Sequence, residues 1–411
     1  MRDTTEHWAP AFAGVTTECV SAMQQTRNTV AEVFGVFLLL GLTSFGGPVA
    51  HLGYFRTEFV ARRHWLDDAA YADLVALCQF LPGPASSQVG IAIGKLRAGY
   101  WGGIAAWVAF TLPSVILLLA FAYGATRLAG PLADGVLHGL KLAALAVVAQ
   151  AVWAMSKSLT PDLRRRLIAL AAAAIALLLP SGLTQLALIA AAALAGYLLA
   201  PPAAVARPAL DRTSTIFLAL FFGLLIVLPI LAAGGNAFMV VAEKFYRTGS
   251  LVFGGGHVVL PLLEAELVTP GLIDRNLFLA GYGAAQAVPG PLFAFAAYTG
   301  ALLNAPPNGI AGALLGLGAI YLPSFLLVFG TLPYWQSLRA NPRLRAGLDL
   351  ANAAVVGLLL ATLYDPVFTS AVFGPLDLAW AIAALALLLI RTPPWLVVLL
   401  SAVTGAALGL L

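Results

Sequence analysis

The stretch "QFLPGPASSQVG", residues 79–90, places two prolines around a glycine and follows them with two serines and a glutamine. It interrupts a chain that consists mainly of long apolar runs. The stretch "QAVPGPLFAF", residues 286–295, repeats the Gln and the Pro-Gly-Pro break in the other half of the chain. What such a break does depends on whether water, lipid or protein surrounds it.

The composition indicates a membrane protein. The 411 residues are 61% hydrophobic and only 10% charged, and many apolar runs approach the roughly 20 residues that cross a bilayer as a helix. The runs are continuous and do not alternate, which favours helices over a barrel. We therefore predict an all-α polytopic membrane protein, preceded by a polar tail at residues 1–28 that lacks a signal-peptide pattern.

Several classes of protein are disfavoured. The only cysteines, Cys19 and Cys78, support neither a disulfide framework nor a thiolate metal site. No pair of histidines has the helical spacing of a metal site, so no metal or other cofactor is predicted. The formal net charge of +4 comes from basic residues at the expected ends of membrane segments, which indicates topology and not nucleic-acid binding.

The chain contains an internal repeat. "SFGGPVAHLGYFRTEFV" (44–60) aligns without gaps on "VFGGGHVVLPLLEAELV" (252–268), and "TLPS" (111–114) matches "YLPS" (321–324). The segment before each Pro-Gly-Pro break aligns in the same way. The predicted organisation is a tail 1–28, a first repeat 29–200, a linker with an extra transmembrane helix 201–237, and a second repeat 238–411.

Charge predicts that the two repeats are inverted. The loop "RTEFVARRHW" of the first repeat is basic, whereas its counterpart in the second repeat is acidic. Conversely, "RANPRLR" (339–345) is basic where the first repeat is neutral. Basic loops face the cytoplasm, and one extra crossing in the linker would turn the second repeat over.

The breaks then read as the tips of four re-entrant hairpins, at Gly46–Gly47, Pro82–Pro84, Gly254–Gly256 and Pro289–Pro291. The expected full crossings lie at about 101–126, 133–156, 164–180, 182–200, 215–235, 308–330, 346–362, 376–391 and 393–411. A topology in which the hairpin arms are full crossings is the alternative.

The breaks suit the binding of an anion near the midplane. Proline lacks an amide hydrogen and begins helices well, so Pro48 and Pro84 should each start a helix whose first amides face the break. Such an N-terminus carries about half a positive charge and attracts anions. Packing and kinking alone are the alternative role of these residues. The predicted substrate-binding residues are Phe45, Gly46, Gly47, Pro48, Gln79, Pro82, Gly83, Pro84, Ser86, Ser87, Gln88, Phe253, Gly254, Gly255, Gly256, Gln286, Pro289, Gly290 and Pro291.

The two Pro-Gly-Pro arms differ in polarity. Ser86, Ser87 and Gln88 follow the first break, whereas apolar residues including Phe293 and Phe295 follow the second. Hydroxyl and amide donors suit an oxyanion. Residues considered for coupling or for the entrance, with a structural role as the alternative, are His51, Lys95, His257 and Glu264.

At these motifs the sequence resembles the chromate ion transporter (CHR) family in its long two-domain form. The resemblance rests on the order and duplication of "FGGPVAHLGYFRTEFV", "QFLPGPASSQVGIAIG", "FGGGHVVLPLLEAELV" and "QAVPGPLFAFAAYTG". It implies export of chromate, and of sulfate-like oxyanions, across the bacterial cytoplasmic (inner) membrane, and hence chromate resistance. Leu272 departs from the tryptophan common in the family.

We therefore expect a secondary transporter and no enzyme, with halves that rock to alternate access. An anion channel and a membrane enzyme acting on lipid phosphates are the alternatives. For the enzyme, Ser86 lacks an evident histidine or carboxylate partner in the sequence. Protons as the coupling ion and a homodimeric assembly are left open.

Overall fold

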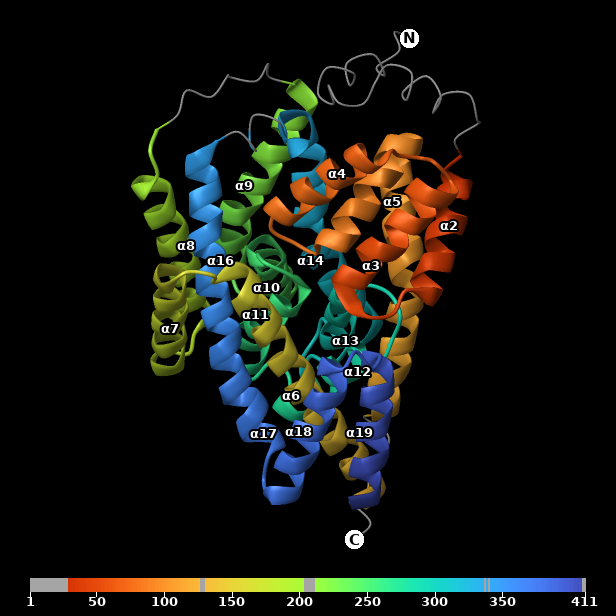
Figure 1. Cartoon of the computed structure of the whole chain (residues 1–411), viewed down its shortest axis with the longest axis vertical. Coiled ribbons are helices and arrows are strands. Elements are labelled where there is room, and N and C mark those ends of the chain that lie inside the picture. Colours follow the sequence, from red (N-terminus) through yellow and green to blue (C-terminus); the bar gives the residue numbers. More distant parts are fainter. Residues whose placement is uncertain (1–28, 126–129, 203–210, 336–337, 339–340, 409–411) are drawn as a thin grey trace.

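The computed structural model describes residues 29–125, 130–202, 211–335, 338 and 341–408. These residues form helices and loops, with no strand among them. The predicted tail 1–28 lies outside the described residues. The helices form an elongated bundle with the first repeat's short helices toward one end and the last helices of the chain toward the other (Figure 1). The all-helical prediction is confirmed.

The first repeat opens with short helices that double back. α2 (Val30–Thr43) is followed after three residues by α3 (Gly47–Arg56), with Gly46 at φ 100° in the turn, a conformation that favours glycine. α3 continues into the π-helical segment η2 (Thr57–Arg62). α4 (Asp68–Phe80) then leads into the first Pro-Gly-Pro break.

α5 (Ala85–Ala125) consists of two helices. Ala98 and Gly99 have non-helical dihedral angles. A Cβ built on Gly94 would lie 2.3 Å from the carbonyl oxygen of Gly102, so the segments on either side of the turn lie against each other. Residues 85–97 are therefore a returning arm, and 100–125 form the following long helix, as the sequence predicts.

The remaining helices follow the same order in both repeats. The first repeat and the linker continue with α6 (Pro131–Leu159), α7 (Leu163–Leu178), α8 (Gly182–Leu199) and α9 (Arg212–Ala233). The second repeat contains α10 (Ala237–Leu251), η3 (Gly256–Val258), α11 (Val259–Leu263), η4 (Glu264–Val268), α12 (Arg275–Ala285), η5 (Leu292–Ala294), α13 (Phe295–Ala301), α14 (Gly309–Thr331), η6 (Leu332–Tyr334), α16 (Pro342–Thr362), η7 (Leu363–Phe368), α17 (Thr369–Ala371), α18 (Pro375–Leu389) and α19 (Pro394–Leu408).

All nine predicted crossings coincide with helices, but they differ in length. Within the described residues, six helices are long and apolar enough to span a membrane: α5, α6, α8, α9, α14 and the α16 region. α7, α18 and α19 have 15–16 residues. Because this is short of the roughly 20 that span a bilayer, their crossing stays a prediction that requires local thinning or partial burial.

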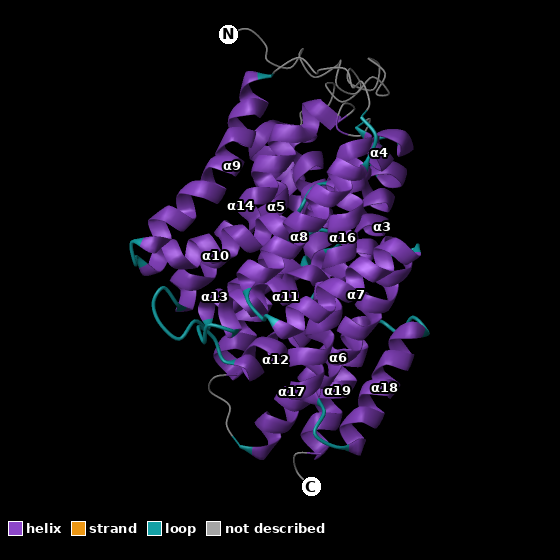
Figure 2. Ribbon diagram, turned by 90° about the vertical axis from the view of Figure 1, so that its left-hand side faces the viewer, coloured by secondary structure: helices purple, strands orange, loops and turns teal. Residues whose placement is uncertain are grey.

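The two repeats are interleaved and are not separate lobes. α6 of the first repeat packs along α18 and α19 of the second, and α16 of the second packs along α7 and α8 of the first (Figure 1). Glycines allow this approach: a Cβ on Gly139 would lie 2.0 Å from the Ser401 carbonyl oxygen, and one on Gly196 would lie 2.2 Å from that of Ala346. Equivalent helices α4 and α12 lie toward opposite ends of the bundle (Figure 1 and Figure 2), in keeping with inverted repeats.

Candidate functional site

Each Pro-Gly-Pro turn is bonded to the opposite repeat. The Gly83 amide donates to the carbonyl oxygen of Val252 at 2.7 Å, and the Gly290 amide donates to that of Ser44 at 2.9 Å. Val252 and Ser44 are the residues that end α10 and α2, directly before the two Phe-Gly-Gly tips. Each Pro-Gly-Pro break therefore meets the Phe-Gly-Gly break of the other repeat through a reciprocal backbone hydrogen bond.

Two serines pack against these glycines. A Cβ on Gly83 would lie 2.7 Å from Ser324 Oγ, and one on Gly290 would lie 2.4 Å from Ser114 Oγ. Gly83 and Gly290 have φ of 126° and 96°, which also favour glycine. Ser114 and Ser324 end the repeated "LPS" motifs. In the sequence, these motifs indicate only the alignment of the repeats, and nothing in them predicts a place in the site.

The Phe-Gly-Gly tips also meet each other. A Cβ on Gly256 would lie 3.2 Å from Pro48 Cγ of the first tip and 3.9 Å from Leu292 Cδ2, which follows the second Pro-Gly-Pro turn. With the two cross-repeat hydrogen bonds, these contacts join all four breaks into one connected cluster. We call it the break cluster: residues 44–48, 82–88, 252–257 and 289–293.

The polar arm after the first break is buried and hydrogen-bonded. Gln88 Nε2 donates to the Pro82 carbonyl oxygen at 2.6 Å, which closes the turn. Ser87 Oγ lies 3.4 Å from Tyr321 OH, and Ser86 Oγ lies 3.4 Å from His51 Nδ1. All three arm side chains are at most 2% exposed. Gln88 thus stabilises the turn, and Ser87 links it to α14 of the second repeat.

The first-repeat side of the break cluster retains polar atoms for a further partner. Four buried side-chain atoms have no hydrogen-bond partner among the described residues: Ser44 Oγ, His51 Nε2, Gln88 Oε1 and Trp107 Nε1. Buried polar groups are costly unless they bond to protein, water or ligand. These atoms therefore retain hydrogen-bonding capacity for water or for an anion.

The arm that follows the second break is apolar. Phe293 and Phe295 are fully buried. Their rings pack against Tyr321 and Tyr282, at centroid separations of 5.7 Å each. The two Pro-Gly-Pro turns therefore share a reciprocal backbone bond, but the arms that follow them differ in polarity.

A histidine stands beside Ser86, which the sequence analysis did not anticipate. His51 and Ser86 are 0% and 2% exposed, and no described carboxylate hydrogen-bonds His51. Among the described residues, no carboxylate therefore orients this imidazole as in a catalytic triad.

The other predicted residues fall into two groups. His257 Nδ1 lies 2.9 Å from Tyr282 OH of α12. A Cβ on Gly254 would lie 3.3 Å from the buried Asn352 Oδ1 of α16. His257 and Gly254 therefore contact helices that pack around the break cluster. Phe45 packs against Trp395 of α19. Residues of the predicted site that form the turns or their immediate neighbours are Gly47, Phe253, Gly255, Gln286, Pro289 and Pro291.

Three predicted residues lie away from the break cluster. Gln79 is exposed on α4. Lys95 is buried at the far end of the returning arm, with Nζ 4.9 Å from the ring centroids of both Tyr100 and Phe329. Glu264 lies in η4, where burial raises its pKa to about 7.

Each repeat also holds a buried glutamate at one equivalent position, within a π-helical segment. Glu58 in η2 is paired with Arg62 and Arg63, and Glu266 in η4 is paired with Lys244 and Arg247 at 3.1 and 2.6 Å. Burial acts to raise the pKa of Glu58, but the two arginines outweigh it and leave the pKa below its usual value. In each repeat, these ion pairs stabilise the end of the hairpin that carries the Phe-Gly-Gly tip.

No group of three or more potential metal-ligating side chains occurs among the described residues. The break cluster and its neighbours offer helix ends, hydroxyls, an imidazole and an amide, and these groups can hydrogen-bond an oxyanion in a partly dehydrated environment.

Comparisons with known proteins show which family the chain resembles. A family model described as chromate transporter matches residues 31–197 and again residues 239–406. The chain is 28% identical over 347 residues to a chromate transport protein of Cupriavidus metallidurans, covering 83% of this chain and 84% of that protein. It is 29% identical over 351 residues to a chromate transport protein of Pseudomonas aeruginosa, covering 81% and 80%. No solved structure matches.

Proposed function

The chain belongs to the chromate transporter family, and from that premise we propose that it exports chromate from the bacterial cytoplasm as a secondary carrier of the inner membrane. The observation that carries this proposal is the reciprocal pair of hydrogen bonds, Gly83 to Val252 and Gly290 to Ser44. They unite four helix breaks at the interface of two inverted repeats, which is where carriers of this architecture hold their substrates.

We propose that the oxyanion binds on the first-repeat side of the break cluster. The Gly83 amide is already bonded to Val252, so it is not assigned as a ligand. The first amides of the returning arm, at Ala85 to Ser87, precede the first hydrogen bond of that helix and carry its positive end. His51 Nε2 and Ser44 Oγ offer further bonding capacity. The apolar arm of Phe293 and Phe295 would close the opposite side.

The interleaving of the two repeats determines which helices can move together to open the site to either side of the membrane. The sequence suggested that the two repeats rock against each other. However, α6 packs with α18 and α19, and α16 packs with α7 and α8. We therefore propose that the moving bodies are these mixed groups, each with helices from both repeats, and that the break cluster is their common hinge.

The direction of transport follows from charge. A negative-inside membrane potential favours the exit of a dianion by about 2.3 kcal/mol per charge per 100 mV. Export therefore needs no other energy source, although proton antiport would add to it. Sulfate, a tetrahedral dianion of similar shape, should compete for the same site.

The proposal is tested by chromate uptake into everted membrane vesicles and purified proteoliposomes, with potential and pH gradient varied separately. Uptake should saturate and be inhibited by sulfate. Flux that does not saturate, or single-channel conductance, would identify an anion channel. Release of phosphate from a lipid phosphate would identify an enzyme.

A further inference from the structure

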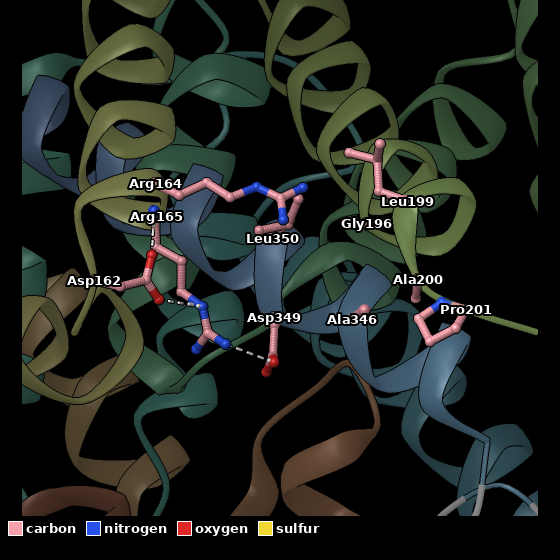
Figure 3. A pocket seen from close by; sticks show the side chains of 10 residues that line it. All are labelled: Asp162, Arg164, Arg165, Gly196, Leu199, Ala200, Pro201, Ala346, Asp349 and Leu350. Atoms are coloured by element: carbon pink, nitrogen blue, oxygen red, sulfur yellow. Dashed lines mark hydrogen bonds and ion pairs between the residues drawn. The ribbon is translucent and has the colours of Figure 1, made fainter.

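A cavity of about 470 Å³ lies at the seam between the repeats, away from the break cluster. It is lined by the start of α7, the end of α8 and the first part of α16 (Figure 3). Its lining residues are Asp162, Arg164, Arg165, Gly196, Leu199, Ala200, Pro201, Ala346, Asp349 and Leu350.

One of the two arginines is committed to protein carboxylates. Arg165 pairs with Asp162 at 3.2 Å and with Asp349 at 2.8 Å, so it neutralises the acidic lining and ties α7 to α16. The Arg164 guanidinium extends over Leu350 toward Leu199 (Figure 3). Arg164 makes no hydrogen bond or ion pair with the described residues, which leaves it as the cation available to a ligand.

A cation lies at the C-terminal end of α8, beside the cavity. A helix C-terminus normally repels anions. Here Arg343 Nε donates to the carbonyl oxygen of Ala200 at 3.3 Å, and its guanidinium lies 5.7 Å from the Tyr197 ring centroid. Arg343 therefore offsets the negative helix end beside the cavity.

Exposed apolar side chains border the cavity. Leu199 lines the cavity and is 68% exposed, and Leu163, next to Arg164, is 70% exposed. In a membrane protein, such side chains contact acyl chains. A ligand that fits has an anionic head for Arg164 and apolar tails for these leucines, which a free inorganic anion does not offer.

We propose that this cavity binds the phosphate headgroup of an anionic glycerophospholipid at the cytoplasmic edge of the membrane. Basic residues of this loop face the cytoplasm by the positive-inside rule, and basic pockets between helices on that side suit anionic headgroups. Because the cavity spans α7 and α8 of one repeat and α16 of the other, the lipid braces the seam between the repeats.

The test uses full-length protein in nanodiscs of phosphatidylcholine, alone or doped with phosphatidylglycerol. Bound lipid is counted by native mass spectrometry, and the melting temperature is recorded. Phosphatidylglycerol should remain bound and raise the melting temperature. Arg164→Ala should weaken its retention about fivefold and remove the thermal effect, with no change in phosphatidylcholine alone.

Arg212→Ala is the matched control, because Arg212 is an exposed arginine at the start of α9 that does not line the cavity. It should behave as the wild type. Equal lipid retention by wild type and Arg164→Ala would overturn the proposal. So would an equal thermal effect of inorganic phosphate in phosphatidylcholine discs, since that result would assign the cavity to a free oxyanion.

Discussion

Replacing Gly83 with alanine should disable the first Pro-Gly-Pro turn. Its φ of 126° costs a non-glycine residue about 1–3 kcal/mol. The new Cβ would lie 2.4 Å from Gln88 Nε2 and 2.7 Å from Ser324 Oγ, so Gln88 must leave the Pro82 carbonyl, a bond worth about 0.5–1.5 kcal/mol. The combined cost is therefore about 1.5–4.5 kcal/mol.

Thermal unfolding and chromate flux in proteoliposomes measure the effect. If only 1.4 kcal/mol of the cost falls on the anion-binding conformation, affinity drops about tenfold. Gly35→Ala is the control, because no atom lies within 4 Å of a Cβ built there and the residue is helical. A Gly83→Ala protein with the melting temperature and flux of Gly35→Ala would show that the turn does not require glycine at position 83.

Four further predictions concern the site, the topology and the packing. Ser86→Ala should raise the KM for chromate, whereas Lys157→Ala should not, because Ser86 is buried in the break cluster and Lys157 only packs on Trp153; saturation kinetics decide this. Asp68 and Arg275 are exposed and can each be replaced by a single cysteine in a background free of Cys19 and Cys78. The two cysteines should react with an impermeant reagent from opposite sides of the membrane, and labelling of both from the same side contradicts the inversion. Gly139→Val should destabilise the protein by about 1–3 kcal/mol through α6 and α19, and Gly124→Val, with no atom within 4 Å, should not; denaturation in detergent measures both. The pKa of Glu264 is raised from 4.5 to about 7 in the folded protein, so the native state binds the proton more tightly than the unfolded state does. The free energy of unfolding should therefore fall as the pH rises from about 4.5 to 7, and Glu264→Gln should flatten a pH series of melting temperatures in that window.

Most of the helix boundaries could be predicted from the sequence, because proline, glycine and apolar runs determine the backbone conformation within a few residues. Proline and glycine at positions 46–48 and 82–84 determine where helices end and begin. The turn at Ala98 and Gly99 was therefore expected between an arm ending near 97 and a helix starting near 101. The nine long apolar segments likewise coincide with helices, since bilayer solvation requires each to satisfy its own backbone.

Contacts between distant residues could not be predicted in this way. The bonds from Gly83 to Val252 and from Gly290 to Ser44 join residues far apart in the chain, and no periodicity specifies such a pair. The same holds for His51 beside Ser86, and for the packing of α6 on α19 through glycines that, in sequence, look like ordinary membrane-helix residues. The repeat itself was the one signal that could have revealed Ser114 and Ser324, because their motif recurs in register with the breaks.

Anion binding at the polar arm is tested most directly by the concentration dependence of chromate flux in proteoliposomes under a controlled potential, compared between Ser86→Ala and Phe293→Ala. We expect saturable flux inhibited by sulfate, a raised KM for Ser86→Ala, and an unchanged KM for Phe293→Ala, because the anion contacts the polar arm and not the apolar one. Absence of saturable chromate flux in the wild type, or an equal rise in KM for both variants, would contradict it.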